Sequence, residues 1–195
     1  MELTRLDDGV LVERAQTGDR EAFRTLVERH MRTVYAVAFD MTGNHHDAED
    51  ISQDVFLRTF QSLGTFRAEA KVSTWLYRTT VNVCIDRSRR KPWRILRNTA
   101  VDSDCDGTPG RRELGNALSQ PETAAEKALL QRYISKALDG LPPRQRAVFV
   151  LRHYHDLPLK EIAQCLEVTE GTVKNTLFKA VRRLRTKLNR YGYHV

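Results

Sequence analysis

Apolar residues recur along the first third of the chain with the spacing of amphipathic helices. They stand three or four positions apart, which places them on one side of a helix that turns once every ~3.6 residues. The clearest series run through Leu11 and Ala15, from Phe23 to Ala38, and from Ile51 to Phe60. No proline occurs before Pro92, so no ring interrupts these segments from within. The pattern predicts several packed helices.

Short polar residues stand where these helices should begin. Asp19 precedes the sequence REAF, and Asp47 precedes AED. An aspartate at a helix N-cap accepts hydrogen bonds from the first backbone amides, and acids in the first turn suit the helix dipole. We therefore predict that Asp19 and Asp47 are N-caps. The sequence TGNHH, residues 42–46, is predicted to separate two of the helices.

The second half of the chain begins with a segment of different composition. From Asn98 to about Glu126 there is no aromatic residue, and three glycines and two prolines occur. Such a segment buries little apolar surface and is typical of a linker. Helical periodicity resumes beyond it and is interrupted at Gly140 and Pro142, where one helix should end and the next begin. No pair of strands is indicated. The predicted fold is all-α, with small helical domains at 1–95 and 126–195 joined by a flexible linker at 96–125.

Charge is distributed in blocks along the 195 residues. The chain holds 32 Lys and Arg against 25 Asp and Glu, a formal net charge of +7 and a pI near 9.5, which favours an anionic partner such as nucleic acid. Residues 47–54 carry four acids and no base, residues 87–97 six bases and no acid, and residues 171–195 seven bases and no acid. These blocks predict separate surfaces for separate partners.

Cysteine usage and hydropathy indicate a cytoplasmic protein without membrane insertion. Cys84, Cys105 and Cys165 are unevenly spaced and form no C-x-x-C pair, so neither a disulfide framework nor a zinc ribbon is predicted. The N-terminus has no apolar signal core, and nowhere do eighteen apolar residues run together.

Residues 159–188 have the form of a helix-turn-helix: a short helix, a tight turn through Val168, and a longer helix capped by Thr169. One side of the second helix is apolar. The other carries lysine and arginine side chains and one asparagine amide. The outward residues are Thr172, Lys174, Asn175, Phe178, Lys179, Arg182 and Arg185. Lys and Asn can read base edges in a major groove while Arg grips phosphates. The structural alternative is a helical hairpin with a solvated cationic face, but an exposed Phe178 suits a thymine methyl or a sugar better than it suits solubility.

Residues 75–90 predict a second nucleic-acid surface. A helical projection places an apolar arc through Leu76, Tyr77, Thr80, Val81, Val83, Cys84 and Ile85. The opposite arc holds Trp75, Arg78, Asn82, Asp86 and Arg89. An aromatic ring beside guanidiniums and an amide can stack an unpaired base, bond its edge and neutralise its backbone. The polar loop at 65–74 could lie along one strand of the nucleic acid. The structural alternative is that Trp75 covers the edge of the core and the arginines are only solvated.

Two other classes of function are compatible with a helix-turn-helix. A transcriptional regulator would bind a symmetric operator through the helix-turn-helix and use the N-terminal half to dimerise or to sense a ligand. An enzyme such as a recombinase would need catalytic residues, and no Walker loop, nucleophile elbow or H-E-x-x-H motif occurs. The pairs His45-His46 and His153-x-His155 lack the spacing of a zinc site, and capping or solvated histidines fit better. No cofactor and no metal are predicted.

Five segments, in order, resemble bacterial RNA polymerase sigma factors of the extracytoplasmic-function type. They are LVERAQTGDREAFRTLVERH, DAEDISQDVFLRTF, FRAEAKVSTWLYRTTVNVCIDRSRR, LPPRQRAVFVLRHYHDLPLKEIAQCLEV and GTVKNTLFKAVRRLR. Together they cover nearly the whole chain except the linker. Several motifs at the right spacing are far more specific than a lone helix-turn-helix.

The resemblance implies a non-enzymatic promoter-specificity subunit that consists of sigma regions two and four. An acidic helix would dock on the clamp helices of the polymerase's largest subunit through Asp47, Glu49, Asp50, Gln53, Asp54 and Phe56. The loop and helix after it would open the minus-10 element and hold a flipped base through Phe66, Arg67, Lys71, Trp75, Arg78, Asn82 and Arg89. The helix-turn-helix would read duplex DNA at the minus-35 element.

The family pattern also implies regulation and some variation in base preference. An anti-sigma factor is an expected partner, and the chain is expected to be monomeric when it is not bound. Ala68 and Lys71 replace the small or acidic residues common in the loop, and Asp54 stands where glutamate is usual. These departures bear on which base is preferred at the minus-10 element.

Overall fold

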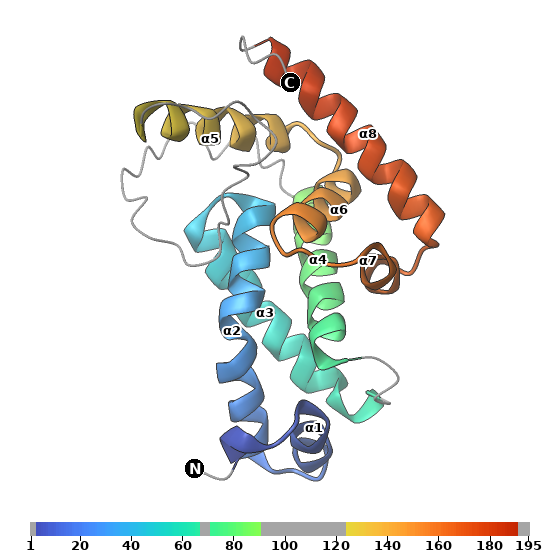
Figure 1. Ribbon diagram of the computed structural model, residues 1–195. Coiled ribbons are helices and arrows are strands. Elements are labelled where there is room, and N and C mark those ends of the chain that lie inside the picture. The colour runs from blue at the N-terminus through green and yellow to red at the C-terminus, as the bar shows by residue number, and fades with distance from the viewer. Residues whose placement is uncertain (1–2, 67–70, 91–123, 191–195) are drawn as a thin grey trace. The chain divides into compact units, whose positions relative to one another are not determined.

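The computed structural model describes residues 3–66, 71–90 and 124–190, with side chains from 132 onward in the last range. Within these ranges the regular structure is helical and contains no strand, so the predicted all-α fold is confirmed (Figure 1). Residues 96–123 of the predicted linker, and Arg67 and Ala68 of the predicted loop, lie outside the described residues. No helix of the described ranges is long and apolar enough to cross a membrane.

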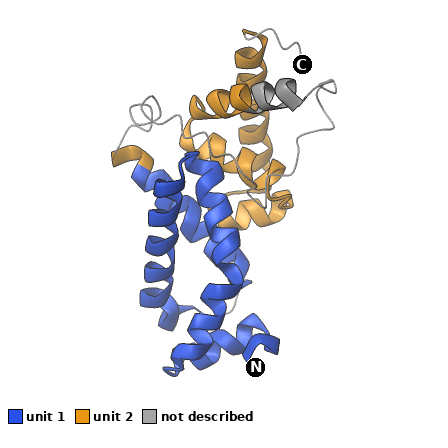
Figure 2. Cartoon of the chain, turned by 90° about the vertical axis from the view of Figure 1, so that its left-hand side faces the viewer, with its two compact units in different colours: residues 1–87 blue, residues 88–195 orange. Residues whose placement is uncertain are grey.

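The chain divides into two compact units, residues 1–87 and 88–195 (Figure 2). The first contains α1 (Asp8–Gln16), α2 (Arg20–Thr42), α3 (His45–Ser62) and most of α4 (Val72–Arg90), with short 3-10 turns at Leu3–Arg5 and Leu63–Thr65. The second contains α5 (Ala124–Asp139), α6 (Pro143–His153), α7 (Leu159–Leu166) and α8 (Glu170–Asn189). Each unit has its own apolar core.

The core of the first unit consists of the inward faces of its four helices. Most of the apolar series predicted from the sequence is buried or half-buried, because residues three and four apart share one side of each helix, but Phe60 at its end is exposed. Its fully buried members include Leu11, Ala22, Val37, Ala38, Ile51, Val55 and Val81. Thr80 is also buried, and its hydroxyl donates to the backbone oxygen of Leu76 at 2.7 Å, so this polar group is satisfied within the core.

One of the two predicted aspartate caps is confirmed and the other is wrong. The Asp19 carboxylate accepts hydrogen bonds from the amides of Glu21 and Ala22 at 3.0 and 3.1 Å. The cap of α3 is Asn44, whose side chain accepts from the amide of Asp47 at 2.9 Å. Gly43 adopts the left-handed conformation with φ 66° and ends α2, so α3 begins two residues before Asp47. The preceding glycine and the short amide side chain fix this start.

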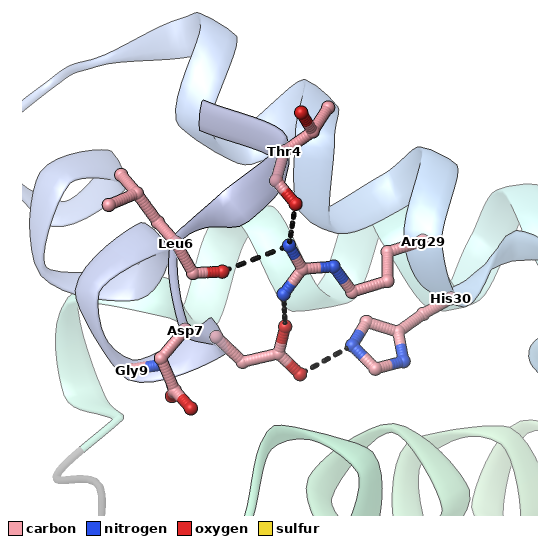
Figure 3. Close-up of polar contacts among 7 residues, drawn as sticks. Thr4, Leu6, Asp7, Gly9, Arg29 and His30 are labelled. Atoms are coloured by element: carbon pink, nitrogen blue, oxygen red, sulfur yellow. Dashed lines mark hydrogen bonds and ion pairs between the residues drawn. The ribbon is translucent and has the colours of Figure 1, made fainter. Parts of the chain in front are cut away.

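A polar cluster fixes the N-terminal turn and α1 to α2 (Figure 3). Arg29 pairs with the carboxylate of Asp8 and donates to the backbone oxygens of Thr4 and Leu6 at 3.2 and 3.0 Å. Nε2 of His30 lies 2.8 Å from the other oxygen of the same carboxylate. One acid at the start of α1 is thus held by two neighbouring residues of α2, which sets the position of α1.

The second unit packs α5, α6 and α7 against the long helix α8. Its core includes Leu138, Leu151, Ile162, Val173, Ala180 and Leu184. Arg146 is buried as well, where it donates to the backbone oxygen of Leu138 at 2.9 Å and pairs with Asp139 at 2.8 Å. The guanidinium supplies a partner to one of the carbonyl groups that the end of α5 leaves unsatisfied. The C-terminal end of α5 is thereby held against α6.

Candidate nucleic-acid interface and acidic docking helix

The helix-turn-helix predicted at the C-terminal end of the chain is formed by α7 and α8. Glu167, with φ 52°, takes the left-handed conformation at the end of α7 and begins the tight turn. The hydroxyl of Thr169 then accepts from the amide of Thr172 at 3.2 Å, so the predicted cap of the second helix is confirmed. The turn is short: α7 ends at Leu166 and α8 begins at Glu170.

All seven residues predicted to face DNA on α8 are exposed. They are Thr172, Lys174, Asn175, Phe178, Lys179, Arg182 and Arg185. Phe178 is 67% exposed, while Val173, Ala180 and Leu184 of the same helix lie in the core. The helix is therefore anchored by one side only, and its other side presents cations, an amide and an aromatic ring. A face of this chemistry can bond base edges and phosphates together.

Helix α4 begins at Val72, three residues before the start predicted from the sequence. Its predicted apolar arc is correct: Leu76, Thr80, Val81, Val83, Cys84 and Ile85 are buried, and Tyr77 is half-buried. Asn82 lies between two buried residues and is itself exposed. Its amide therefore points away from the core on a helix whose orientation the core fixes. Such a side chain can meet a ligand without any rearrangement of the fold.

Trp75 is not a fully exposed stacking surface. It is half-buried, and its ring packs on that of Phe66 with centroids 4.7 Å apart and planes at 31°. The side-chain amide of Gln16 donates to the backbone oxygens of Leu63 and Phe66, both at 2.9 Å, which holds this segment against α1. Two residues predicted for one site thus touch each other. They form an aromatic pair at the start of α4.

The other residues predicted for the same surface differ in exposure. Lys71 and Arg89 are exposed, and Arg78 and Asp86 are half-buried. Asp86 lies 4.0 Å from Arg58 of α3. The surface of α4 is therefore part aromatic and part cationic, with Asn82 as its exposed amide.

The six residues predicted to dock on a partner through α3 fall into three groups. Glu49, Gln53 and Asp54 are exposed. Asp47 and Asp50 are half-buried and pair with Arg87 of α4 at 3.1 and 2.6 Å. Phe56 is only 8% exposed and belongs to the core. The structure thus gives these residues different environments.

Two apolar residues of α3 are exposed: Leu57, which lies outside the predicted apolar series, and Phe60, which that series wrongly includes. Leu57 is 60% and Phe60 is 54% exposed, and the ring of Phe60 meets that of Phe23 edge-on with centroids 5.0 Å apart. Gln53, Leu57 and Phe60 are spaced by four and three residues, so they lie on one side of the helix. A strict helical projection of α3 would have separated Leu57 from the buried arc. The exposed side of α3 is therefore acidic at its start and apolar towards its end.

The histidine pairs weighed as metal ligands have other neighbours. Nδ1 of His45 lies 2.6 Å from the hydroxyl of Tyr35, and its ring packs on Phe39. The ring of His153 packs on Phe149 with centroids 4.5 Å apart. In the part of the chain that the structure describes, no three His, Cys, Asp or Glu side chains gather as metal ligands.

Comparison with known proteins finds a family match in each half of the chain. Residues 26–95 match the family model of sigma-70 region 2, and residues 131–184 match that of sigma-70 region 4. CnrH, solved in complex with the cytosolic domain of CnrY, superimposes with a TM-score of 0.65 at 23% identity, covering 94% of this chain and 97% of that one. This likeness concerns the fold.

The relatives in sequence extend over almost the full length. The ECF RNA polymerase sigma factor SigW of Bacillus subtilis is 32% identical over 180 residues, which are 91% of this chain and 94% of the relative. The ECF RNA polymerase sigma-E factor of Escherichia coli K12 is 31% identical over 192 residues, 94% and 95% of the two chains. The chain belongs to the extracytoplasmic-function family of RNA polymerase sigma factors.

Proposed function

We propose that this sigma factor binds core RNA polymerase through α3, captures an unstacked minus-10 base on α4, and reads the minus-35 element with α8. Sigma region two would lie within residues 1–95 and sigma region four within 126–195. The observation that carries the proposal is the placement of Asn82, an exposed amide on a helix whose two neighbouring residues are buried. The regulator alternative leaves this amide and the acidic side of α3 without a role.

Promoter opening follows from the chemistry of the α4 surface. A base that leaves the stack loses its pairing and stacking, which costs a few kcal/mol. The Asn82 amide can bond the edge of such a base, and the Phe66–Trp75 pair can pack beside it. Lys71, Arg78 and Arg89 would neutralise the backbone of the same strand. A captured base is thereby stabilised outside the duplex.

Docking on the clamp helices of the polymerase would use the outer side of α3. Glu49, Gln53 and Asp54 supply its exposed polar groups, and Leu57 and Phe60 extend it with apolar surface. Polar groups around exposed apolar side chains are typical of a protein interface. Phe56 would contribute indirectly, by packing α3 into the first unit.

We also propose that the chain is monomeric when free and that an anti-sigma factor controls it. The RpoE sigma factor of Bartonella quintana, solved in complex with the anti-sigma factor NepR, has the same fold with a TM-score of 0.59 at 18% identity over 86% of this chain. A binder that covered α3 would prevent docking. Co-purification of a tagged copy of the chain from cells, with mass spectrometry of the bound proteins, would test this partner.

In vitro transcription tests the function directly. The purified chain and bacterial core RNA polymerase should together give discrete start sites on a library of genomic promoter fragments, and core alone should not. Footprints at the minus-35 and minus-10 positions should require both proteins. Tight binding of a palindromic duplex without polymerase, together with no new start sites, would instead support the dimeric regulator.

The docking surface gives a first prediction. Gln53→Ala should weaken association with core polymerase by removing a polar contact, and Asp54→Arg should weaken it more, because an exposed acid near a cationic partner accelerates association. We expect about a threefold loss for Gln53→Ala and about a tenfold loss for Asp54→Arg at moderate salt. Fluorescence anisotropy of labelled protein titrated with core polymerase would measure both.

The choice of Asp54 rather than Asp50 matters for this test. Asp50 bonds Arg87, so Asp50→Arg would place two guanidiniums together and disturb the first unit as well as the surface. Glu13→Gln, at an exposed acid of α1, is the matched control and should bind like the wild type. Wild-type affinity in both α3 variants would contradict docking through this surface.

A further inference from the structure

The acidic start of α3 contains a cation supplied by another helix. Nη2 of Arg87, near the end of α4, lies 2.6 Å from a carboxylate oxygen of Asp50 and 3.1 Å from one of Asp47. The two acids are three residues apart and therefore lie on the same side of α3. One guanidinium thus bridges two carboxylates of the neighbouring helix.

The bridge is shielded from solvent more than an ordinary surface pair. The side chains of Arg87 and Asp47 are 23% and 24% exposed, and that of Asp50 is 40% exposed. Burial lowers the pKa of Arg87, but the hydrogen bond to Asp50 and the charges of Asp47, Asp50 and Asp54 outweigh it, so the pKa is raised overall. The guanidinium is therefore charged at neutral pH. By contrast, Arg58 and Asp86 lie 4.0 Å apart and are about half exposed, a pair that contributes little.

The bridge joins the two helices to which the proposed function gives different tasks. Helix α3 carries the docking surface, and α4 carries Asn82. We propose that Arg87 is a positioning residue: it fixes the start of α3 to the end of α4, so that polymerase docking and base capture share one rigid frame. In this role Asp47 and Asp50 bind Arg87 within the protein. The cations of core polymerase would instead contact Glu49 and Asp54. The inference rests on the proposed function.

Two explanations of Arg87 predict opposite changes in affinity for core polymerase when the residue is replaced: one from charge alone, the other from positioning. Arg87→Gln makes the docking region more negative, which by charge alone should strengthen the attraction of a cationic partner. If Arg87 positions α3, the same change should weaken the binding of core polymerase, roughly fivefold. Arg87→Lys keeps the charge but lacks the planar fork that reaches both acids, and should lie between Arg87→Gln and the wild type.

A charge exchange identifies the partner of Arg87. Asp50→Arg and Arg87→Asp should each weaken binding of core polymerase, and the double variant should recover most of the loss, because Arg at position 50 then lies beside Asp at position 87 and the native Asp47. If Asp50 instead contacted the polymerase directly, the double variant would bind as poorly as Asp50→Arg. Affinity for core polymerase would be measured by anisotropy, well below the melting temperature of each variant found by circular dichroism.

Three controls separate positioning from general damage. Arg90→Gln removes an exposed cation of the same helix end, and Glu13→Gln removes an exposed acid of α1; both should bind core like the wild type. Binding of a random-sequence duplex through α8 should be unchanged in every variant. Unchanged or tighter core binding by Arg87→Gln, or no recovery in the charge exchange, would overturn the inference. A wild-type chain that does not bind core at all would overturn the proposed function and this role with it.

Discussion

Replacement of Asn82 by alanine is expected to leave promoter DNA bound but closed. The amide would bond a base only after that base has left the stack, so its loss acts on the open complex alone. A hydrogen bond left unmade at such a site costs about 1–3 kcal/mol, which corresponds to roughly a tenfold to hundredfold loss of open complex. Permanganate reactivity of the minus-10 thymines, together with transcript yield, would measure the defect.

A premelted template gives this prediction its internal control. A bubble at the minus-10 element removes the cost of opening and should therefore restore much of the transcription by the Asn82→Ala variant. Because Asn82 is exposed between buried neighbours, its truncation should not disturb the core, as is usual for surface positions. Asn189→Ala, the same change at an exposed position of α8, should melt promoters normally. Wild-type melting by Asn82→Ala, or no gain on the bubble, would mean that α4 serves only the fold.

Trp75 is expected to matter for the same step, but through a different mechanism. Its ring packs on Phe66, so Trp75→Ala removes a contact within the protein as well as any stacking with DNA. A defect in this variant should therefore be accompanied by a lower melting temperature of the first unit, whereas the Asn82 defect should not.

The second large effect is expected at the start of α8. Lys174→Ala and Asn175→Ala should relax the preference for particular bases, because contacts to base edges discriminate by ~1–3 kcal/mol per position. Arg182→Ala and Arg185→Ala should instead weaken binding to all sequences and reduce the salt dependence by about one counterion each. Selection from a random duplex library, followed by titration at several salt concentrations, separates the two kinds of loss.

The exposed positions of α8 make this comparison clean. All four side chains are exposed, so each truncation should preserve the helix. Arg132→Ala, at an exposed cation of α5, is the control for a mere change in net charge. Equal, sequence-independent losses in all four α8 variants would refute the division between base reading and phosphate binding.

The helices and most of their buried sides could be predicted from the sequence because helical spacing is a local property. The apolar arcs of α4 and α8 depend only on the 100° turn per residue, and the caps at Asp19 and Thr169 depend on backbone amides two or three residues away. The same locality explains the error at Asp47. Asn44 and Asp47 are both good caps, and the choice depends on where Gly43 ends the preceding helix.

The environment of each candidate side chain could be predicted less well from the sequence. Phe56 and Phe60 both belong to the predicted apolar series, and only the packing of α3 against its neighbours makes one buried and the other exposed. Trp75 lies on the predicted polar arc, yet its ring packs on that of Phe66 and is half-buried. Both outcomes depend on contacts between elements, which a projection of a single helix does not contain.

By itself the sequence determined the all-α class, the helix-turn-helix, and the outward face of α8, because these follow from local spacing and capping. Its ordered motifs also indicated the sigma factor family. Only the tertiary structure decided which acids of α3 remain exposed, since Arg87 lies 37 residues from Asp50 along the chain. A pairing over that distance arises when α3 and α4 pack together, and the energy of an ion pair depends on the burial and geometry that this packing creates.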